Sequence, residues 1–201
     1  MNIVKVVSRA TNCYVIGQAR DRILIDVGWP GTLPKLSAIL KRKGIELQEI
    51  TYLLATHYHP DHAGLVQEVK NQGVCLIILE QQIDTVPILK TYMKPSDRYV
   101  DIMIYDTVQL TTKASRGLLK TIGIDGEIIS TPGHSDDSVT LVLDSGAAFT
   151  GDLPNLKLAT EGAMEQVVQS WQAILALNAK MVYPGHGPVR AARVMVERDR
   201  A

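Results

Sequence analysis

The stretch THYHPDH, residues 56–62, carries the strongest structural signal in this chain. It places three of the five histidines and one aspartate within six consecutive positions, 57–62. An apolar, β-like run, 50–55, precedes it, and the amphipathic segment AGLVQEVKNQG follows it. The pattern therefore predicts a loop between a strand and a helix, the kind of position where catalytic groups collect.

Strand and helix patterns extend from this loop in both directions. We expect strands at 3–8, 12–17, 22–26, 50–55, 74–79, 126–131, 138–144, 147–151 and 180–183. We expect helices in GWPGTLPKLSAILKRKG, which Gly44 ends, in AGLVQEVKNQG, in EQQIDTVPILKTY, which Pro87 interrupts or shortens, and at 164–177. This order favours an α/β sandwich of two mixed sheets with helices outside, although the pattern alone leaves a doubly wound sheet open.

Composition narrows the classes of function. The 201 residues are 46% hydrophobic with no linker-like stretch, so we expect one domain, 1–201. Basic and acidic residues number 21 each, which favours a small-molecule substrate over nucleic acid or a membrane surface. The start MNIVKVVSRATN lacks signal-peptide features, so we expect a cytoplasmic protein. Cys13 and Cys75 lie in apolar runs and are expected to be small buried residues.

In segment 92–106 the apolar residues follow neither the spacing of a helix nor that of a strand. It contains Met93, Met103 and three tyrosines around the sequence MKPSD. Such a segment could form a flap over a pocket, a contact between the two copies of a homodimer, or an ordinary connection that covers the core.

The two remaining histidines also end β-like runs. His134 in TPGHSDD and His186 in YPGHGP each follow a Pro-Gly pair. Within the first loop, His57 and His59 are two residues apart and project the same way in an extended backbone, while a turn at Pro60 carries Asp61 and His62 toward a neighbouring position. Imidazoles and carboxylates without thiolates suit zinc, and also iron or manganese.

THYHPDH, TPGH, TGD and PGHG, in this order, resemble the metal-binding motifs of the metallo-β-lactamase-fold hydrolase superfamily. The resemblance runs from about residue 12 to 187. It implies a four-layer αββα sandwich with two divalent metal ions at one edge, and zinc is the metal that we expect there. It also implies how the seven ligands divide: His57, His59 and His134 on one metal, Asp61, His62 and His186 on the other, and Asp152 between them. Asp26, in LIDVG, matches a carboxylate that accepts the second ring proton of a histidine ligand.

The resemblance implies hydrolysis by a metal-bound hydroxide, with Asp61 as the catalytic group that orients it or takes up a proton. Two divalent ions, two carboxylates and one hydroxide leave a net charge of about +1, which favours anionic or polarised carbonyl substrates. A small thioester, as in glyoxalase II-like members, or a lactone is the leading expectation. Tyr58, between two ligands, and Lys157, in LPNLKLATEG, are the candidate substrate contacts; the alternatives are that Tyr58 packs under the loop and that Lys157 is simply exposed to solvent.

Other readings stay open. The commonest zinc β-lactamases carry cysteine where this chain has Asp152, so the name of the fold does not give the activity. SDDS at 135–138 replaces the frequent Thr-x-Gly-Ser after TPGH, and this difference argues against a glutathione thioester as the substrate. The short stretch after His186 lacks the basic helical region of glyoxalase II. Phosphodiesterases and mononuclear iron persulfide dioxygenases resemble the same motif set. A zinc-binding protein without turnover is a further alternative, although seven ligands exceed the four of a closed structural site.

Overall fold

A computed structural model of the chain describes residues 2–18 and 21–196. Its first sheet has six strands that follow one another in chain order. They are β1 (Ile3–Ser8), β2 (Thr11–Gln18), β3 (Asp21–Ile25), β4 (Tyr52–Leu54), β5 (Cys75–Leu79) and β6 (Val108–Leu110). β1, β2 and β3 are antiparallel, and β3 to β6 are parallel. The sheet is therefore mixed, as the sequence predicts.

The second sheet has five strands in the order β11-β10-β9-β8-β7. They are β7 (Gly126–Ser130), β8 (Val139–Leu143), β9 (Ala147–Gly151), β10 (Met181–Pro184) and β11 (Arg190–Ala191). β7, β8 and β9 form an antiparallel meander, and β10 runs parallel to β9. As a result β7, β9 and β10 all point the same way, and their carboxyl ends share one edge.

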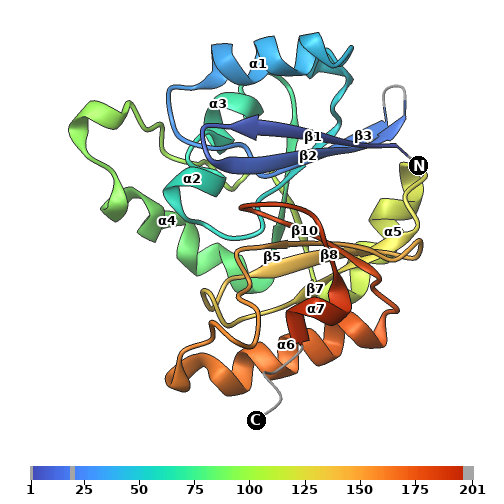
Figure 1. Cartoon of the computed structure of the whole chain (residues 1–201). Helices are drawn as coiled ribbons and strands as arrows, with labels where there is room; N and C mark the ends of the chain where they lie inside the picture. The colour runs from blue at the N-terminus through green and yellow to red at the C-terminus, as the bar shows by residue number, and fades with distance from the viewer. Residues whose placement is uncertain (1, 19–20, 197–201) are drawn as a thin grey trace.

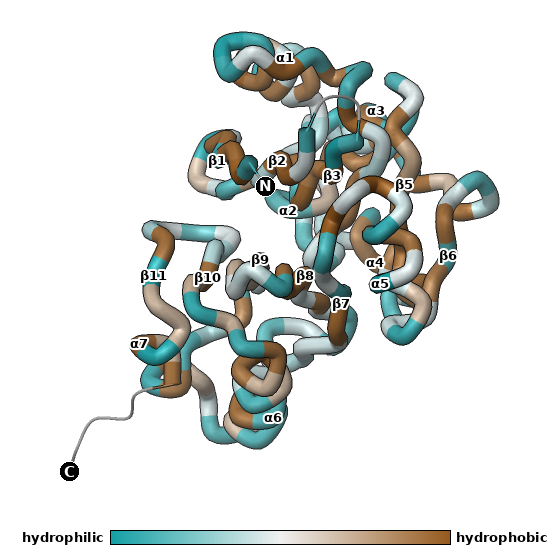
Figure 2. The backbone as a smooth tube through the Cα atoms, turned by 90° about the vertical axis from the view of Figure 1, so that its right-hand side faces the viewer, coloured by the Kyte–Doolittle hydropathy of each residue, from teal (hydrophilic) through white to brown (hydrophobic). Residues whose placement is uncertain are grey.

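Helices cover the outer faces of both sheets (Figure 1). The α-helices are α1 (Leu33–Arg42), α2 (Pro60–Ala63), α3 (Val66–Lys70), α4 (Val86–Leu89), α5 (Thr112–Thr121), α6 (Met164–Ala176) and α7 (Ala192–Val196). Short 3₁₀ helices lie at Leu47–Glu49, Glu80–Thr85, Lys90–Tyr92, Pro95–Asp97 and Glu161–Ala163. Figure 2 shows α1 and α6 on opposite sides of the two groups of strands. No helix in the described part of the chain is long and apolar enough to cross a membrane.

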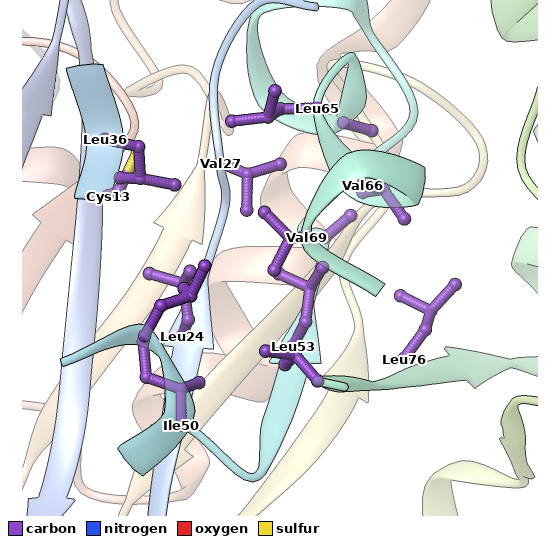
Figure 3. Close-up of a cluster of buried hydrophobic side chains, with 14 of the residues drawn as sticks. Cys13, Leu24, Val27, Leu36, Ile50, Leu53, Leu65, Val66, Val69 and Leu76 are labelled. Carbon is purple, nitrogen blue, oxygen red and sulfur yellow. The ribbon is translucent and has the colours of Figure 1, made fainter. Parts of the chain in front are cut away.

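Three layers of apolar side chains hold these elements together. Neighbouring residues of a strand face opposite sides, so Leu53 packs under the outer helices and Leu54 packs between the sheets. Figure 3 shows the outer layer, in which Leu36 of α1 and Val69 of α3 face the first sheet. Beyond the second sheet, Trp171 of α6 joins the third layer. The predicted αββα sandwich is confirmed, and the doubly wound alternative is wrong.

Some elements differ from the sequence prediction. The helix expected at 80–92 is broken into a 3₁₀ helix, α4 and a second 3₁₀ helix. Pro87 sits in the first turn of α4, where its missing N–H costs no hydrogen bond. The expected helix after the histidine loop is divided into α2 and α3. β6, α5, β11 and α7 were not predicted; β6 and β11 span only three and two residues, too short for a clear period.

Segment 92–106 lies against the first layer of the core. Ile102 is buried there, and Met93, Tyr99 and Ile104 pack against it. The segment therefore covers the core, as one of its three expected roles requires. Its first residue also borders the histidines, because the ring of Tyr92 lies 5.9 Å from that of His59. Neither cysteine forms a disulfide: Cys13 is buried and Cys75 is half-buried.

Candidate metal centre

The predicted ligands gather at the edge where strand ends from both sheets meet. Asp26 directly follows β3, and the histidine loop follows β4 in the first sheet. In the second sheet His134, Asp152 and His186 follow β7, β9 and β10. Because the contributing strands of each sheet run in parallel, residues far apart in sequence reach one place.

Three histidines form the first group of potential ligands: His57, His59 and His134. Nε2 of His134 lies 3.0 Å from Nδ1 of His59. Nε2 of His57 is buried and has no hydrogen-bond partner in the described part of the chain. The ring centroids of His57 and His59 lie 4.6 Å apart, so the two side chains meet on the same side of the loop, as their spacing predicts.

Asp61, His62 and His186 form a second group. Nε2 of His186 lies 3.1 Å from Oδ2 of Asp61 and 3.4 Å from Nε2 of His62. Asp152 lies between the two groups: its Oδ2 is 3.4 Å from Nε2 of His186 and 3.8 Å from Nε2 of His134. The structure thus brings all seven predicted ligands into one cluster.

Hydrogen bonds fix the orientation of two of the rings. Nδ1 of His62 donates to Oδ2 of Asp26 at 2.8 Å, and Nδ1 of His186 donates to the carbonyl of Ala10 at 2.9 Å. Both partners only accept, so each Nδ1 carries a proton and each Nε2 points into the cluster. The predicted contact between Asp26 and a histidine of the loop is present.

Asp26 occupies an unusual backbone conformation. It is 1% exposed and has a φ of 57°, a region that residues other than glycine rarely adopt. Its carboxylate also accepts from the backbone N–H of Thr56, at 2.8 Å, and from the Thr56 hydroxyl. These contacts hold the strained residue in place and tie the end of β3 to the start of the histidine loop.

Burial and neighbouring charges shift the pKa values in the cluster. Burial, together with the nearby imidazoles of His62 and His134, holds the pKa of His57 well below its usual range. Burial alone would lower the pKa of His62, but the carboxylates of Asp26 and Asp152 outweigh it and raise that pKa to about 10. Burial would raise the pKa of Asp152, yet its contact with His62, whose Nε2 lies 3.4 Å from Oδ1, and the charges of three histidines lower it. His57 is therefore neutral at pH 7, as a metal ligand must be.

The residues of the cluster fit divalent metal ions. Two ligands of one zinc ion, each at ~2.1 Å, lie at most ~4.2 Å apart. The pairs described above, at 3.0 to 3.8 Å, meet this condition. Besides Nε2 of His57, Oδ1 of Asp152 is buried without a hydrogen-bond partner in the described part of the chain. Unpartnered buried polar atoms are costly, and a cation would satisfy both. Nitrogen and oxygen donors suit zinc, iron or manganese equally.

A buried aspartate that sequence reasoning did not assign ties the two sheets together beside the cluster. Asp137, 2% exposed, accepts the backbone N–H of Tyr58 at 2.7 Å. The backbone N–H of Val139 donates to the carbonyl of Thr56 at 2.8 Å. The only signal in the sequence was the position of Asp137, just before an apolar strand and three residues after a histidine.

The loop that carries His186 is held in a similar way. The amide of Asn12 donates to the carbonyls of Pro184 and Gly187, both at 2.9 Å. The hydroxyl of Thr11 donates to Oδ2 of Asp61 at 3.1 Å. The start of β2 therefore positions ligands from both sheets, a role that the sequence pattern did not indicate.

The two predicted substrate contacts have different outcomes. Tyr58 is 0% exposed and packs in the outer core layer, so the prediction that it contacts substrate is wrong. The reason is the strand-like alternation of the loop, which turns Tyr58 away from the side of His57 and His59. Lys157 is exposed on the loop after Asp152. It does not line the cavity beside the cluster, and its contact with substrate stays a prediction.

Comparisons with known proteins agree with this fold. A family model described as the metallo-beta-lactamase superfamily matches residues 7–186. The chain is 30% identical over 187 residues to a beta-lactamase-like protein 2 homolog of Caenorhabditis elegans, covering 90% of this chain and 57% of that protein. It is 30% identical over 190 residues to an atrochrysone carboxyl ACP thioesterase of Aspergillus fumigatus, covering 90% and 52%. The chain thus spans little more than half the length of these relatives.

Solved structures show the same architecture. A metallo-beta-lactamase family protein from Thermus thermophilus superposes with a TM-score of 0.73 at 21% identity, covering 96% of this chain and 76% of that one. The BLEG-1 B3 metallo-beta-lactamase gives a TM-score of 0.73 at 23% identity, covering 96% and 95%. At these identities the likeness concerns the fold.

Proposed function

This chain belongs to the metallo-beta-lactamase superfamily, and from that premise we propose that it is a metal-dependent hydrolase of a small thioester, lactone or related ester. We propose further that its centre holds two divalent metal ions and that these ions are zinc. The observation that carries the proposal is the position of Asp152, whose carboxylate lies between a group of three histidines and a second group of two histidines and Asp61.

Each residue of the cluster has a part in this proposal. His57, His59 and His134 would hold one ion, Asp61, His62 and His186 the other, and Asp152 would bridge them. Metal ions bound there would polarise the carbonyl and lower the pKa of a bound water to ~7. Asp61, fixed by the Thr11 hydroxyl, would orient the attacking water and take up its proton. Asp26 and the Ala10 carbonyl would keep His62 and His186 turned toward the ions.

The choice of an ester has two supports. One relative is named as an acyl carrier protein thioesterase, and it is 30% identical to this chain. The chain also has equal numbers of basic and acidic residues, so it offers no broad basic field for nucleic acid. Phosphodiester cleavage is therefore the weaker alternative within the same chemistry.

One observation favours a second candidate function. His57, His62 and Asp152 form a group of two histidines and one carboxylate, the ligand set of many mononuclear iron oxygenases. A single iron held in this way would fit a persulfide dioxygenase. Metal analysis and oxygen consumption separate the two candidates.

The test is a reaction panel on metal-defined protein. It covers a thioester, a lactone, a phosphodiester, a β-lactam, and a persulfide with oxygen measured. We expect hydrolysis of the thioester or lactone by the zinc-loaded protein and a loss of at least ~100-fold in kcat with Asp152→Ala. Unchanged activity and metal content in Asp152→Ala would contradict the dinuclear assignment. Oxygen consumption by a one-iron protein would support the second candidate instead.

A further inference from the structure

A cavity of about 370 Å³ lies directly beside the cluster. His134, Asp152 and His186 form one wall of it. The loop after Asp152 and the segment after His186 contribute the rest, including Leu158 and Arg190. Ligand pockets usually hold roughly 300–1,000 Å³, so this cavity fits a small ligand that can reach the cluster.

Arg190 is the one lining residue of this cavity that always carries a positive charge. It lies on β11, which pairs with β10, the strand whose end carries His186. The Arg190 guanidinium is exposed and makes no hydrogen bond or ion pair with any residue in the described part of the chain. Elsewhere an arginine such as Arg116 pairs with carboxylates, here Glu127 and Asp144. A permanent positive charge without a partner among the described residues is thus available to a ligand in the cavity.

The rest of the wall is largely apolar. Leu153 and Met195 are buried, but Leu158 is 74% exposed at the cavity. An exposed leucine beside a concave site offers contact to an apolar stretch of a ligand. The cavity therefore combines the metal-binding cluster, an apolar surface and one unpaired guanidinium.

We propose that Arg190 is a substrate-positioning residue that binds a carboxylate of the substrate. This inference rests on the proposed hydrolase function and narrows it to esters that carry an acidic group, with the reactive carbonyl at the cluster and an apolar stretch near Leu158. The planar guanidinium matches a carboxylate with two parallel hydrogen bonds, which fixes direction as well as position. Esters without the acidic group lose this contact and no other.

The test compares two thioesters that differ in one group. One is a hemisuccinyl thioester, with a free carboxylate, and the other is its carboxamide counterpart. We expect Arg190→Met to lower kcat/KM for the carboxylate ester by ~10- to 100-fold, mainly through KM, because a hydrogen bond to a charged group is lost. The carboxamide ester should change less than ~2-fold, and Arg190→Lys should restore part of the loss.

Arg193→Met is the matched control. Arg193 is exposed on α7, three residues from Arg190, and does not line the cavity. Its substitution should leave both esters unchanged. Metal content of Arg190→Met equal to that of the unsubstituted protein establishes that the cluster is intact. Equal loss on both esters, or no loss on either, would overturn the proposal.

A binding measurement separates this proposal from the hydrolase function. Titration calorimetry with succinate and succinamate on zinc-loaded protein needs no turnover. If the reaction panel shows no hydrolysis, the proposed function fails, and the role of Arg190 still stands on succinate binding that weakens by ~10-fold or more in Arg190→Met. Succinate binding that is the same in both proteins would overturn it. Arg190-dependent binding of a phosphate monoester without succinate binding would overturn the carboxylate assignment.

Discussion

The two sheets supply the cluster in different ways. The first sheet delivers four potential ligands on one loop, and two of them, His57 and His62, are 1% and 0% exposed. The second sheet delivers three potential ligands on three separate turns, and the side chains of His134 and His186 are 30% and 42% exposed. Hydrogen bonds of Asp26, Thr56 and Asp137 hold the histidine loop of the first sheet in place, whereas the turns of the second sheet border the cavity.

This difference separates two tasks. The side from the first sheet contains the two fully buried histidines and is anchored by hydrogen bonds, so it fixes the positions of these potential ligands before any ion binds. The side from the second sheet is open, so a substrate can approach the cluster there. Preorganised ligands on rigid elements and variable residues on the open side are a common arrangement in enzymes. Under the proposed hydrolase function, residues of the second sheet would decide which ester binds.

The largest effect should come from the point where the two sheets touch. Gly151 ends β9 at a φ of 54°, and a Cβ there would lie 2.4 Å from Oγ1 of Thr56. We expect Gly151→Ala to lower the free energy of unfolding by about 3 kcal/mol, from overpacking and from the left-handed backbone. Urea denaturation measures it.

Gly187→Ala is its control, because Gly187 has a φ of 80° but a Cβ there meets nothing within 4 Å. The left-handed backbone alone should cost about 1 kcal/mol. Equal losses in the two variants would show that the close approach between the sheets is unimportant.

Weakening the hydrogen bonds that anchor the histidine loop should have the next largest effect, and this effect should be on metal affinity. Asp26→Asn keeps the shape of the side chain but removes the charge that faces Nδ1 of His62. We expect zinc affinity, measured by competition with a chelator, to fall by ~10- to 100-fold. Asp144→Asn, an exposed carboxylate paired with Arg116, should leave the affinity unchanged. If Asp26→Asn binds zinc as tightly as the unsubstituted protein, the first sheet does not preorganise the ligands.

The smallest effect on stability should come from the open side. Leu158 is 74% exposed, so Leu158→Ser should change the free energy of unfolding by less than about 0.5 kcal/mol. Its effect should instead appear as a higher KM for esters with an apolar acyl chain. A loss of stability above about 1 kcal/mol would show that the loop after Asp152 is packed and is not an open wall.

The sequence was most informative where chemistry and strand ends coincide. The seven potential ligands and Asp26 could be found because histidines and aspartates follow apolar runs in recognisable motifs. The layers of the core followed from the strand pattern and from the family resemblance. Alternation along the loop places Tyr58 on the side away from His57, which agrees with the second of its two expected positions, packed under the loop.

Other features depend on contacts between distant residues. Asp137 anchors the backbone of Tyr58, 79 positions earlier, and nothing local marks it as an anchor. Arg190 lines the cavity because β11 pairs with β10, and a strand of two residues leaves no periodic pattern. The short helices around α4 reflect tertiary packing more than local propensity.

The number of metal ions per chain tests the central claim most directly. The protein is stripped with a chelator, titrated with zinc and analysed by native mass spectrometry beside Asp152→Ala. We predict two zinc ions per unsubstituted chain, and fewer than two at the same free zinc concentration in Asp152→Ala, because Asp152 lies between both ligand groups. A single ion in the unsubstituted protein, retained in full by Asp152→Ala, would contradict the account.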